Sequence, residues 1–316
     1  MSGTEPVGRG ASPHRAAPTT TPASATDDVI HDIGFRHYDG ERFGRGWVVR
    51  SLLVETLRGI FGLGRPARAK AMPWVLVSFL TVPPLIMALV VVLTRQPELP
   101  VSYSQYPAGF WLVIALFVGG AAPYCVSRDL RHGVMPLYLS RPMARTDYVL
   151  ARFVGLSLAV FGVLALGETT LLVGALLAEL PAGEQITGWL GGLLLCALLA
   201  VELSAITLLI AAFTPRRGLG VAAIMTGLVV GSGMVGIIVG ISDEQGLTAV
   251  AQFLPALDPF TLVDGLAVSL LGESTFRPYP FPDGFGATAI YLAVWAAVVG
   301  ACLLLLFRRY RKAGGV

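Results

Sequence analysis

Two carboxylates stand out because they lie inside long apolar stretches of the chain. Glu168 and Glu202 each interrupt a run of residues that would otherwise suit the interior of a bilayer. A charged carboxylate in hydrocarbon costs several kcal/mol unless it is paired, neutral or wetted. Neither glutamate has a lysine or arginine near it in the sequence, so we expect a protonated carboxyl or a wet cavity.

Two interpretations of these glutamates stay open. The first is contact with a transported substrate or ion along a translocation path. The second is a protonated carboxyl that holds two helices together through a hydrogen bond to a hydroxyl group. The hydroxyl groups closest in the sequence are those of Thr169, Thr170, Ser204 and Thr207.

No set of catalytic residues accompanies the glutamates. The chain has no GxxxxGKS/T phosphate-binding loop, so it does not bind ATP by that route. All four histidines lie outside the apolar runs, which argues against an intramembrane Ser–His hydrolase around Ser232 of the sequence Gly231-Ser232-Gly233. We expect no catalytic residue in this chain.

A metal site is not indicated either. His31, Asp32, His37 and Asp39 fit no zinc-binding spacing and have no cysteine to help them. The three cysteines are far apart and lie in or at the ends of apolar runs, which favours neither a disulfide framework nor a metal knuckle. We expect this chain to bind no metal and no cofactor.

Membrane spans are the elements that must position these residues. Hydrophobic residues make up 54% of the 316 positions and charged residues 14%, and the mean hydropathy is +0.70. This composition is typical of a membrane protein. Six apolar runs come near the roughly 20 residues that a helix needs to cross a bilayer. They cover residues 74–94, 108–127, 148–178, 186–212, 218–241 and 286–307.

The charges between the runs predict an orientation. Arginine and lysine gather before the first run, between the second and third, between the fourth and fifth, and after the sixth. The opposite loops carry mainly acidic residues, with Arg95 and Arg277 as exceptions. The positive-inside rule therefore predicts a multi-pass protein of the cytoplasmic membrane with both termini in the cytoplasm.

The residues before the first span divide into two parts. Residues 1–29 are rich in Thr, Pro, Ala and Ser and predict a disordered cytoplasmic tail. Residues 30–72 predict a cytoplasmic cap and an amphipathic helix, which begins at Trp47 and should lie in the membrane interface. The alternative is a helix packed on its own protein. The apolar face of this helix comprises Val49, Leu52, Leu53, Leu57, Ile60 and Phe61.

Two further features belong to the predicted six-span domain at residues 73–312. In the external loop at 242–285, Asp258 and Pro259 suit the start of a helix that lies at the outer interface or dips back into it. In the fifth span, four glycines at small-xxx-small spacings favour a close contact, either with a second subunit or within the chain. These are Gly227, Gly231, Gly236 and Gly240.

A polar and basic stretch at residues 127–152 separates the second and third spans. The helical spacing of its apolar residues predicts a short amphipathic helix, which Pro142 ends, and Thr146 and Asp147 suit the N-cap of the next helix. Such a helix along the membrane face is suited to be contacted and displaced by a soluble partner. The plainer alternative is a positive loop that only fixes topology.

This stretch resembles the cytoplasmic loop of ABC-2 type transporter permeases. In that family an acidic residue precedes a glycine, a Leu-rich turn, a Ser/Thr-x-Pro-like sequence, a basic residue and the third span. The sequence departs mildly from the commonest pattern, with Asp129 in place of Glu and Val134 in place of Thr. The resemblance covers residues 47–312 and leaves out 1–46. The positions that it marks for ATPase coupling are Asp129, Arg131, Gly133, Leu137, Tyr138, Ser140, Pro142 and Arg145.

The resemblance implies a fold, a function and partners. It implies an all-α membrane protein that is the permease subunit of a bacterial-type ABC exporter, paired with a second permease subunit as a homodimer or heterodimer. Each permease would contact a separate ATPase subunit, which binds ATP and Mg²⁺, through this loop and the interfacial helix. ATP-driven closure would then rock the spans between inward-facing and outward-facing states. Membrane lipid is the other expected partner, and nucleic acid is not.

Two other classes of function stay open. One is a membrane-embedded enzyme that uses Glu168 and Glu202. The other is a non-transporting scaffold or sensor that acts through its N-terminus, and truncation of residues 1–46 would separate it from a transporter. The few charges in the spans favour an apolar drug-like compound, a lipid or an exported metabolite as the substrate.

Overall fold

A computed structural model describes residues 40, 43–64, 66–134, 137–138, 140, 142–214 and 216–313. The description below concerns the unit Phe43–Val316. The predicted tail at 1–29 and nearly all of the predicted cap before residue 43 lie outside the described residues.

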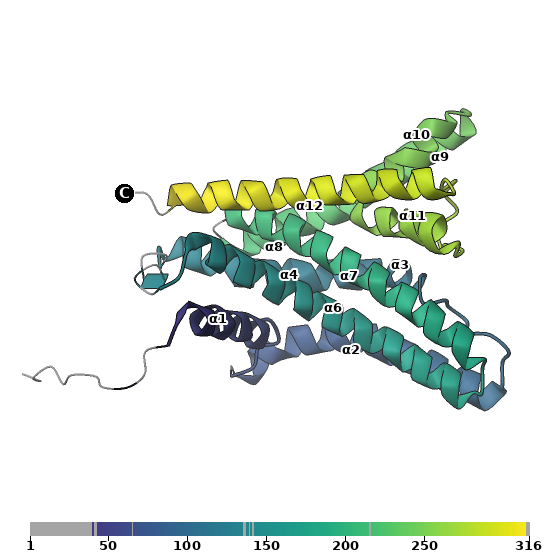
Figure 1. The fold of residues 1–316 in the computed structure, drawn as a ribbon, viewed down its shortest axis with the longest axis horizontal. Coiled ribbons are helices and arrows are strands. Elements are labelled where there is room, and N and C mark those ends of the chain that lie inside the picture. Colours follow the sequence, from purple (N-terminus) through teal and green to yellow (C-terminus); the bar gives the residue numbers. More distant parts are fainter. Residues whose placement is uncertain are drawn as a thin grey trace, which may run out of the picture. The chain divides into compact units, whose positions relative to one another are not determined.

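Every regular element among the described residues is a helix, as predicted, and these residues form no strand. Figure 1 shows the long helices α2, α6, α7 and α12 running along one another. In chain order the elements are α1 (Arg45–Ile60), α2 (Ala67–Thr94), α3 (Tyr106–Gly109), α4 (Trp111–Arg131), α6 (Arg145–Leu177), α7 (Ala182–Phe213), α8 (Arg217–Met225), the π-helical η1 (Thr226–Val230), α9 (Gly231–Glu244), α10 (Thr248–Phe253), the 3₁₀ turn η2 (Leu254–Leu257), α11 (Pro259–Leu271) and α12 (Phe285–Ala313).

Five of the six predicted spans correspond to helices that are long and apolar enough to cross a membrane. They are Lys70–Thr94, Arg145–Leu177, Ala182–Phe213, Arg217–Glu244 and Phe285–Arg311. The chain is therefore a multi-pass membrane protein. The fourth of these helices runs from α8 through η1 into α9.

The second predicted span, at residues 108–127, differs from the structure. The break at Phe110 separates the short helix α3 from α4, so the apolar helix is only Trp111–Ser127. At that length it falls short of the roughly 20 residues that cross the hydrocarbon core. A different segment becomes the sixth candidate: Thr248–Leu257 and Pro259–Leu271 are bent by 119° and form either a broken span or a re-entrant loop.

The predicted start of the external helix is confirmed. Asp258 is the N-cap of α11, its carboxylate accepts a hydrogen bond of 3.0 Å from the backbone N–H of Thr261, and Pro259 is the first helical residue. The helix ends at Gly272, whose φ of +67° is the left-handed conformation that glycine adopts without strain.

Helices α6 and α7 form the centre of the bundle. In the most apolar segment of α6, 61% of the residues are buried, and in that of α7, 56% are buried. In the other three long spans the buried share is 22% or less. Helices α1 and α2 pack on α6, while α4 and α12 pack on α7. The crossing of α2 and α6 is tight, because a methyl group in place of the Gly174 hydrogen would overlap the side chain of Ala88 and lie 2.7 Å from its Cα.

Candidate functional site

An arginine of the third predicted span organises the end of the bundle at which the polar stretch lies. Arg152 of α6 is 3% exposed, and its Nη2 lies 2.8 Å from Oδ2 of Asp129 near the end of α4. Tyr148, one turn earlier in α6, donates a 2.6 Å hydrogen bond to the same Asp129 oxygen. Two side chains of α6 therefore hold the first residue that the family resemblance marks for coupling.

The same arginine reaches α1. Its Nη1 lies 2.8 Å from Oε2 of Glu55 and donates a 2.9 Å hydrogen bond to Oγ1 of Thr56. The backbones approach closely here, since a methyl group at Gly155 of α6 would lie 2.9 Å from Cγ2 of Thr56. Arg152 thus connects α1, α4 and α6, three helices that are far apart in the sequence.

A second ion pair joins the starts of α1 and α6. The Arg45 guanidinium makes a bidentate contact with Asp147, with distances of 2.7 Å and 2.6 Å to its two carboxylate oxygens. This contact raises the pKa of Arg45 above its usual value. Asp147 also accepts a 2.9 Å hydrogen bond from the backbone N–H of Ala144. The N-cap is Ala144, so the prediction that Thr146 or Asp147 is the N-cap is wrong, and Asp147 caps the helix from its third position.

Gly133 terminates α4. Its φ is +60°, in the left-handed region that L residues rarely adopt. This conformation lets the N–H of Val134 donate a 3.2 Å hydrogen bond to the carbonyl of Asp129, as in helix ends closed by glycine. Arg131, in the last turn of α4, is exposed. The glycine of the family pattern therefore has a structural reason, which is to turn the chain out of α4 beside Asp129.

The remaining marked residues divide into a packed group and an exposed group. The Tyr138 ring lies 5.4 Å from the Tyr148 ring, and burial raises its pKa. Leu137 is 71% exposed, and Ser140 and Pro142 are exposed as well. The prediction of one amphipathic helix through Leu130, Val134, Leu137 and Tyr138 is wrong in its first half, because Leu130 belongs to α4 and Gly133 turns the chain before Val134, which is not helical. Leu137 and Tyr138 are helical, while residues 135, 136, 139 and 141 lie outside the described residues.

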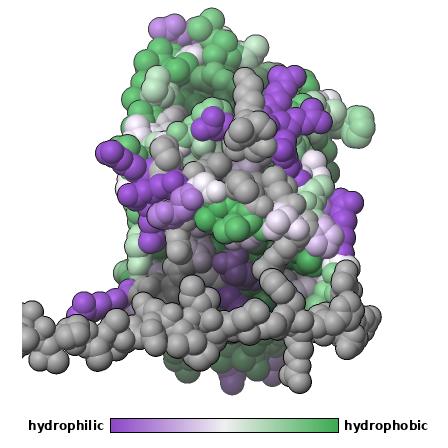
Figure 2. Space-filling model, turned by 90° about the vertical axis from the view of Figure 1, so that its left-hand side faces the viewer, coloured by the Kyte–Doolittle hydropathy of each residue, from purple (hydrophilic) through white to green (hydrophobic). Residues whose placement is uncertain are grey.

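Arg145, the last of the marked residues, begins α6 and donates a 3.3 Å hydrogen bond to the carbonyl of Arg311 in α12. Figure 2 faces this end of the molecule and shows hydrophilic side chains gathered around it. The marked residues are therefore polar or exposed side chains close to the ends of α4, α6 and α12.

The predicted helix before the first span exists as α1, and its two sides differ. Leu52, Thr56 and Ile60 are buried. The other residues of the predicted apolar face are at least half-buried, and of these Val49, Leu57 and Phe61 pack on the core. Because α6 covers this face, α1 packs on its own protein, the alternative left open by the sequence. A position of α1 in the membrane interface stays a prediction.

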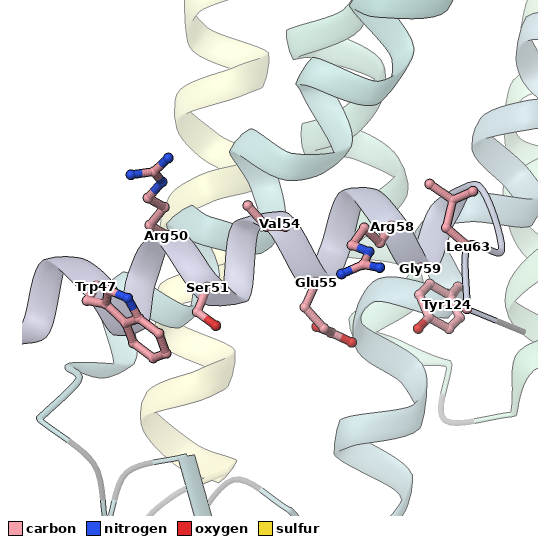
Figure 3. Close-up of a pocket in the computed structure, with 10 residues that line it drawn as sticks. Trp47, Arg50, Ser51, Val54, Glu55, Arg58, Gly59, Leu63 and Tyr124 are labelled. Atoms are coloured by element: carbon pink, nitrogen blue, oxygen red, sulfur yellow. The ribbon is translucent and has the colours of Figure 1, made fainter. Parts of the chain in front are cut away.

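The other side of α1 lines an open groove of about 490 Å³. Figure 3 shows Trp47, Ser51 and Glu55 pointing to one side of the helix, with Tyr124 of α4 at the far end. Glu55 therefore has two roles in the geometry: it contacts Arg152 and it lines an open surface.

Glu168 is fully buried between α6 and α7. The Cys196 thiol of α7 donates a 3.0 Å hydrogen bond to its Oε1, while Oε2 has no partner among the described residues. The expected partners of the glutamates are occupied elsewhere: Thr169 and Thr170 donate to carbonyls of their own helix, as does Thr207. The interaction between α6 and α7 is thus made with a thiol that the sequence did not single out.

Glu202 of α7 is 2% exposed, and its Oε2 has no hydrogen-bond partner within the described part of the chain. The hydroxyl of Ser204, two residues further on, is also buried without a partner there. The assignment of Glu168 and Glu202 to a translocation path stays a prediction.

Replacement of Glu168 by glutamine is expected to change the stability by less than about 1 kcal/mol, because the amide has the same shape and its oxygen can accept from Cys196. Thermal unfolding in detergent would measure this. A loss of several degrees would show that the carboxylate is ionised and paired. Transport retained by the Glu168→Gln, Glu202→Gln double variant would exclude both residues from the mechanism.

The four glycines of the fifth span differ in their surroundings. A methyl group at Gly236 would lie 2.8 Å from the Tyr279 hydroxyl, and one at Gly227 would lie 3.8 Å from Ile210, an ordinary contact. Nothing lies within 4 Å of the position of a methyl group at Gly231 or Gly240. Packing within the chain therefore accounts for Gly236 alone, and the subunit interface stays a prediction.

The comparison with known families agrees with this fold and loop. The model of the ABC-2 family transporter proteins matches residues 25–311, and the chain belongs to that family. The match begins at residue 25 and so includes residues that the sequence resemblance left out. No curated protein matches the chain. The chain is therefore a membrane protein of the ABC transporter class, in a family whose members are transport subunits.

Arg152 is the residue at the centre of the contacts among α1, α4 and α6, and sequence reasoning did not single it out. Arg152 is the last residue of the polar stretch at 127–152, but it is not one of the eight positions that the resemblance marks for ATPase coupling. A signal was present, because it is an arginine inside the predicted third span, where an unpaired cation is costly. Its partners could not be read from the sequence, since Glu55 is 97 residues away.

Proposed function

We propose that this chain is the permease subunit of an ATP-binding cassette exporter, which moves a substrate across the cytoplasmic membrane. A separate nucleotide-binding subunit would bind ATP and Mg²⁺ and hydrolyse the ATP. A second permease subunit, identical or different, would complete the membrane part. Both termini would lie in the cytoplasm, which the basic residues at the ends of the spans support.

The observation that carries this proposal is the Arg152 contact set. Two of its partners lie on α1, and the third is Asp129 at the end of α4, where the polar stretch begins. The family resemblance assigns ATPase contact to this stretch and to the helix before the first span. Arg152 itself belongs to α6, a central helix of the bundle. A displacement of the loop or of α1 would therefore be passed to α6 through charge-assisted hydrogen bonds of the buried Arg152 side chain.

The exposed surface next to this contact set is suited to a soluble partner. Leu137 is an apolar side chain that is 71% exposed at the polar end of the protein. Tyr138, its neighbour, packs on Tyr148, which in turn lies 5.4 Å from Tyr310 of α12. A partner that covers Leu137 would thus press on rings that belong to two long helices.

Purification of the chain from its native membranes in mild detergent tests the proposal. We expect a soluble ATPase in stoichiometric amount, lost when Asp129–Leu139 is replaced by a Gly/Ser linker. The Leu137→Asp chain should also fail to bring down the ATPase, and because Leu137 is exposed, this change leaves the fold intact. Removal of residues 1–24, which lie outside the family match, should retain the ATPase. A chain that keeps its oligomer but brings no ATPase would contradict the proposal.

A further inference from the structure

A narrow crevice opens on the bundle between the end of α1, the first turns of α2, the middle of α4 and the first residue of α8. Its volume is about 220 Å³. Phe117 and Gly120 of α4 line it together with Met72 and Leu76 of α2. Met72 is 51% exposed, and α2 is one of the three long spans with few buried residues. The crevice is therefore apolar and lies beside a surface that faces lipid.

Two arginines line the same crevice, Arg68 and Arg217. Both are exposed, and neither forms an ion pair with a carboxylate of the described residues. Arg68 is in the first turn of α2, and Arg217 is the first residue of α8. Helix N-termini carry unpaired N–H groups and a partial positive charge. Two cations thus line a mainly apolar crevice, and their two full charges outweigh the partial negative charge of the end of α1, whose last residues Gly59 and Ile60 also line it.

We propose that this crevice binds one anionic phospholipid, independently of the transport function. The headgroup phosphate would lie between Arg68 and Arg217, and an acyl chain would lie along Met72 and Leu76. The unpaired arginines favour an anionic headgroup over a zwitterionic one. The apolar wall favours a lipid over free phosphate, which would leave that surface uncovered.

Gly120 keeps the crevice open. A methyl group at this position would lie 3.7 Å from Cε of Met72, which is ordinary contact. A larger side chain would occupy the space assigned to the acyl chain and leave both arginines in place. Gly120→Leu therefore separates the acyl contribution from the headgroup contribution.

Native mass spectrometry of the full-length chain in detergent micelles tests this site. It would be titrated with phosphatidylglycerol and with phosphatidylcholine of the same acyl chains. We expect one phosphatidylglycerol to bind more tightly than phosphatidylcholine. A surface arginine contributes about 1 kcal/mol to anionic lipid binding, or roughly fivefold. Arg68→Gln and Arg217→Gln should each weaken phosphatidylglycerol about fivefold, and the double variant should remove the preference.

Arg216→Gln is the matched control, since Arg216 is the neighbour of Arg217 and does not line the crevice. It should bind phosphatidylglycerol like the unaltered chain. Gly120→Leu should weaken both lipids, and inorganic phosphate at the same concentration should displace neither. Any one of three results would overturn the proposal. The two lipids could bind with equal affinity, Arg216→Gln and Arg217→Gln could have equal effects, or Gly120→Leu could have no effect. Displacement by phosphate would reduce the site to an anion site and overturn the lipid assignment.

Discussion

Replacement of Arg152 by glutamine is expected to destabilise the protein by about 2–3 kcal/mol. Loss of one partner from a fully buried ion pair costs about 3–5 kcal/mol, because the other charge is left buried and unpaired. The cost here is lower, since the side chains of Asp129 and Glu55 are 16% and 53% exposed and water can solvate them in part. The unfolding midpoint in detergent should fall by roughly 5 °C or more.

Arg308→Gln is the control for this change, because Arg308 is an exposed arginine near the end of α12. It should unfold within about 1 °C of the unaltered protein, as surface substitutions usually do. Arg152→Lys should restore only part of the loss, because an ammonium cannot span Asp129 and Glu55 as the guanidinium fork does. Equal midpoints for Arg152→Gln and Arg308→Gln would contradict the assigned role of Arg152.

Two glycine-to-alanine changes in α6 are expected to have opposite signs. At Gly174 the added methyl group would overlap the Ala88 side chain and press on the α2 backbone, and overpacking of this kind costs about 1–3 kcal/mol. At Gly162 nothing lies within 4 Å of the added methyl group. That change should stabilise by about 0.5–1 kcal/mol, because glycine is the more costly residue inside a helix.

The comparison has an internal control, since both changes are chemically identical and occur in one helix. Unfolding midpoints and the fraction of folded protein after gel filtration would be measured together. A Gly174→Ala protein as stable as Gly162→Ala would show that α2 does not cross α6 at this glycine. The packing of the first span on the centre of the bundle would then need revision.

Much of the fold follows from the sequence because hydrocarbon imposes a simple rule on spans. Apolar runs of sufficient length predicted five of the long helices, and Asp258 with Pro259 predicted the start of α11. The run at 108–127 was predicted too long because composition does not reveal a local break, here at Phe110. Gly133 was singled out only by the family resemblance, and the structure adds its left-handed conformation, which no pattern in the sequence predicts.

The candidate site was harder to predict because its key contacts join distant segments. Periodicity assigns a face to α1, yet it cannot say whether lipid or α6 covers that face. Small residues such as Gly155 let α6 pack closely on α1. Which helix packs on such a glycine is fixed only by the tertiary fold. The same reason explains Glu168, for which neighbouring hydroxyls were expected and a thiol 28 residues away was found.

In the proposed mechanism, Arg152 links the loop, α1 and α6, and this link transmits ATPase movement to the spans. The most direct test is the ATP hydrolysis rate of the purified complex in lipid nanodiscs, compared between the unaltered chain, Arg152→Gln and Arg308→Gln. We expect the Arg152→Gln complex to keep the ATPase bound but to lose the part of the hydrolysis rate that depends on the permease, whereas the Arg308→Gln complex should keep that part. An Arg152→Gln complex that hydrolyses ATP as fast as the other two, at equal assembly, would show that Arg152 does not transmit the movement.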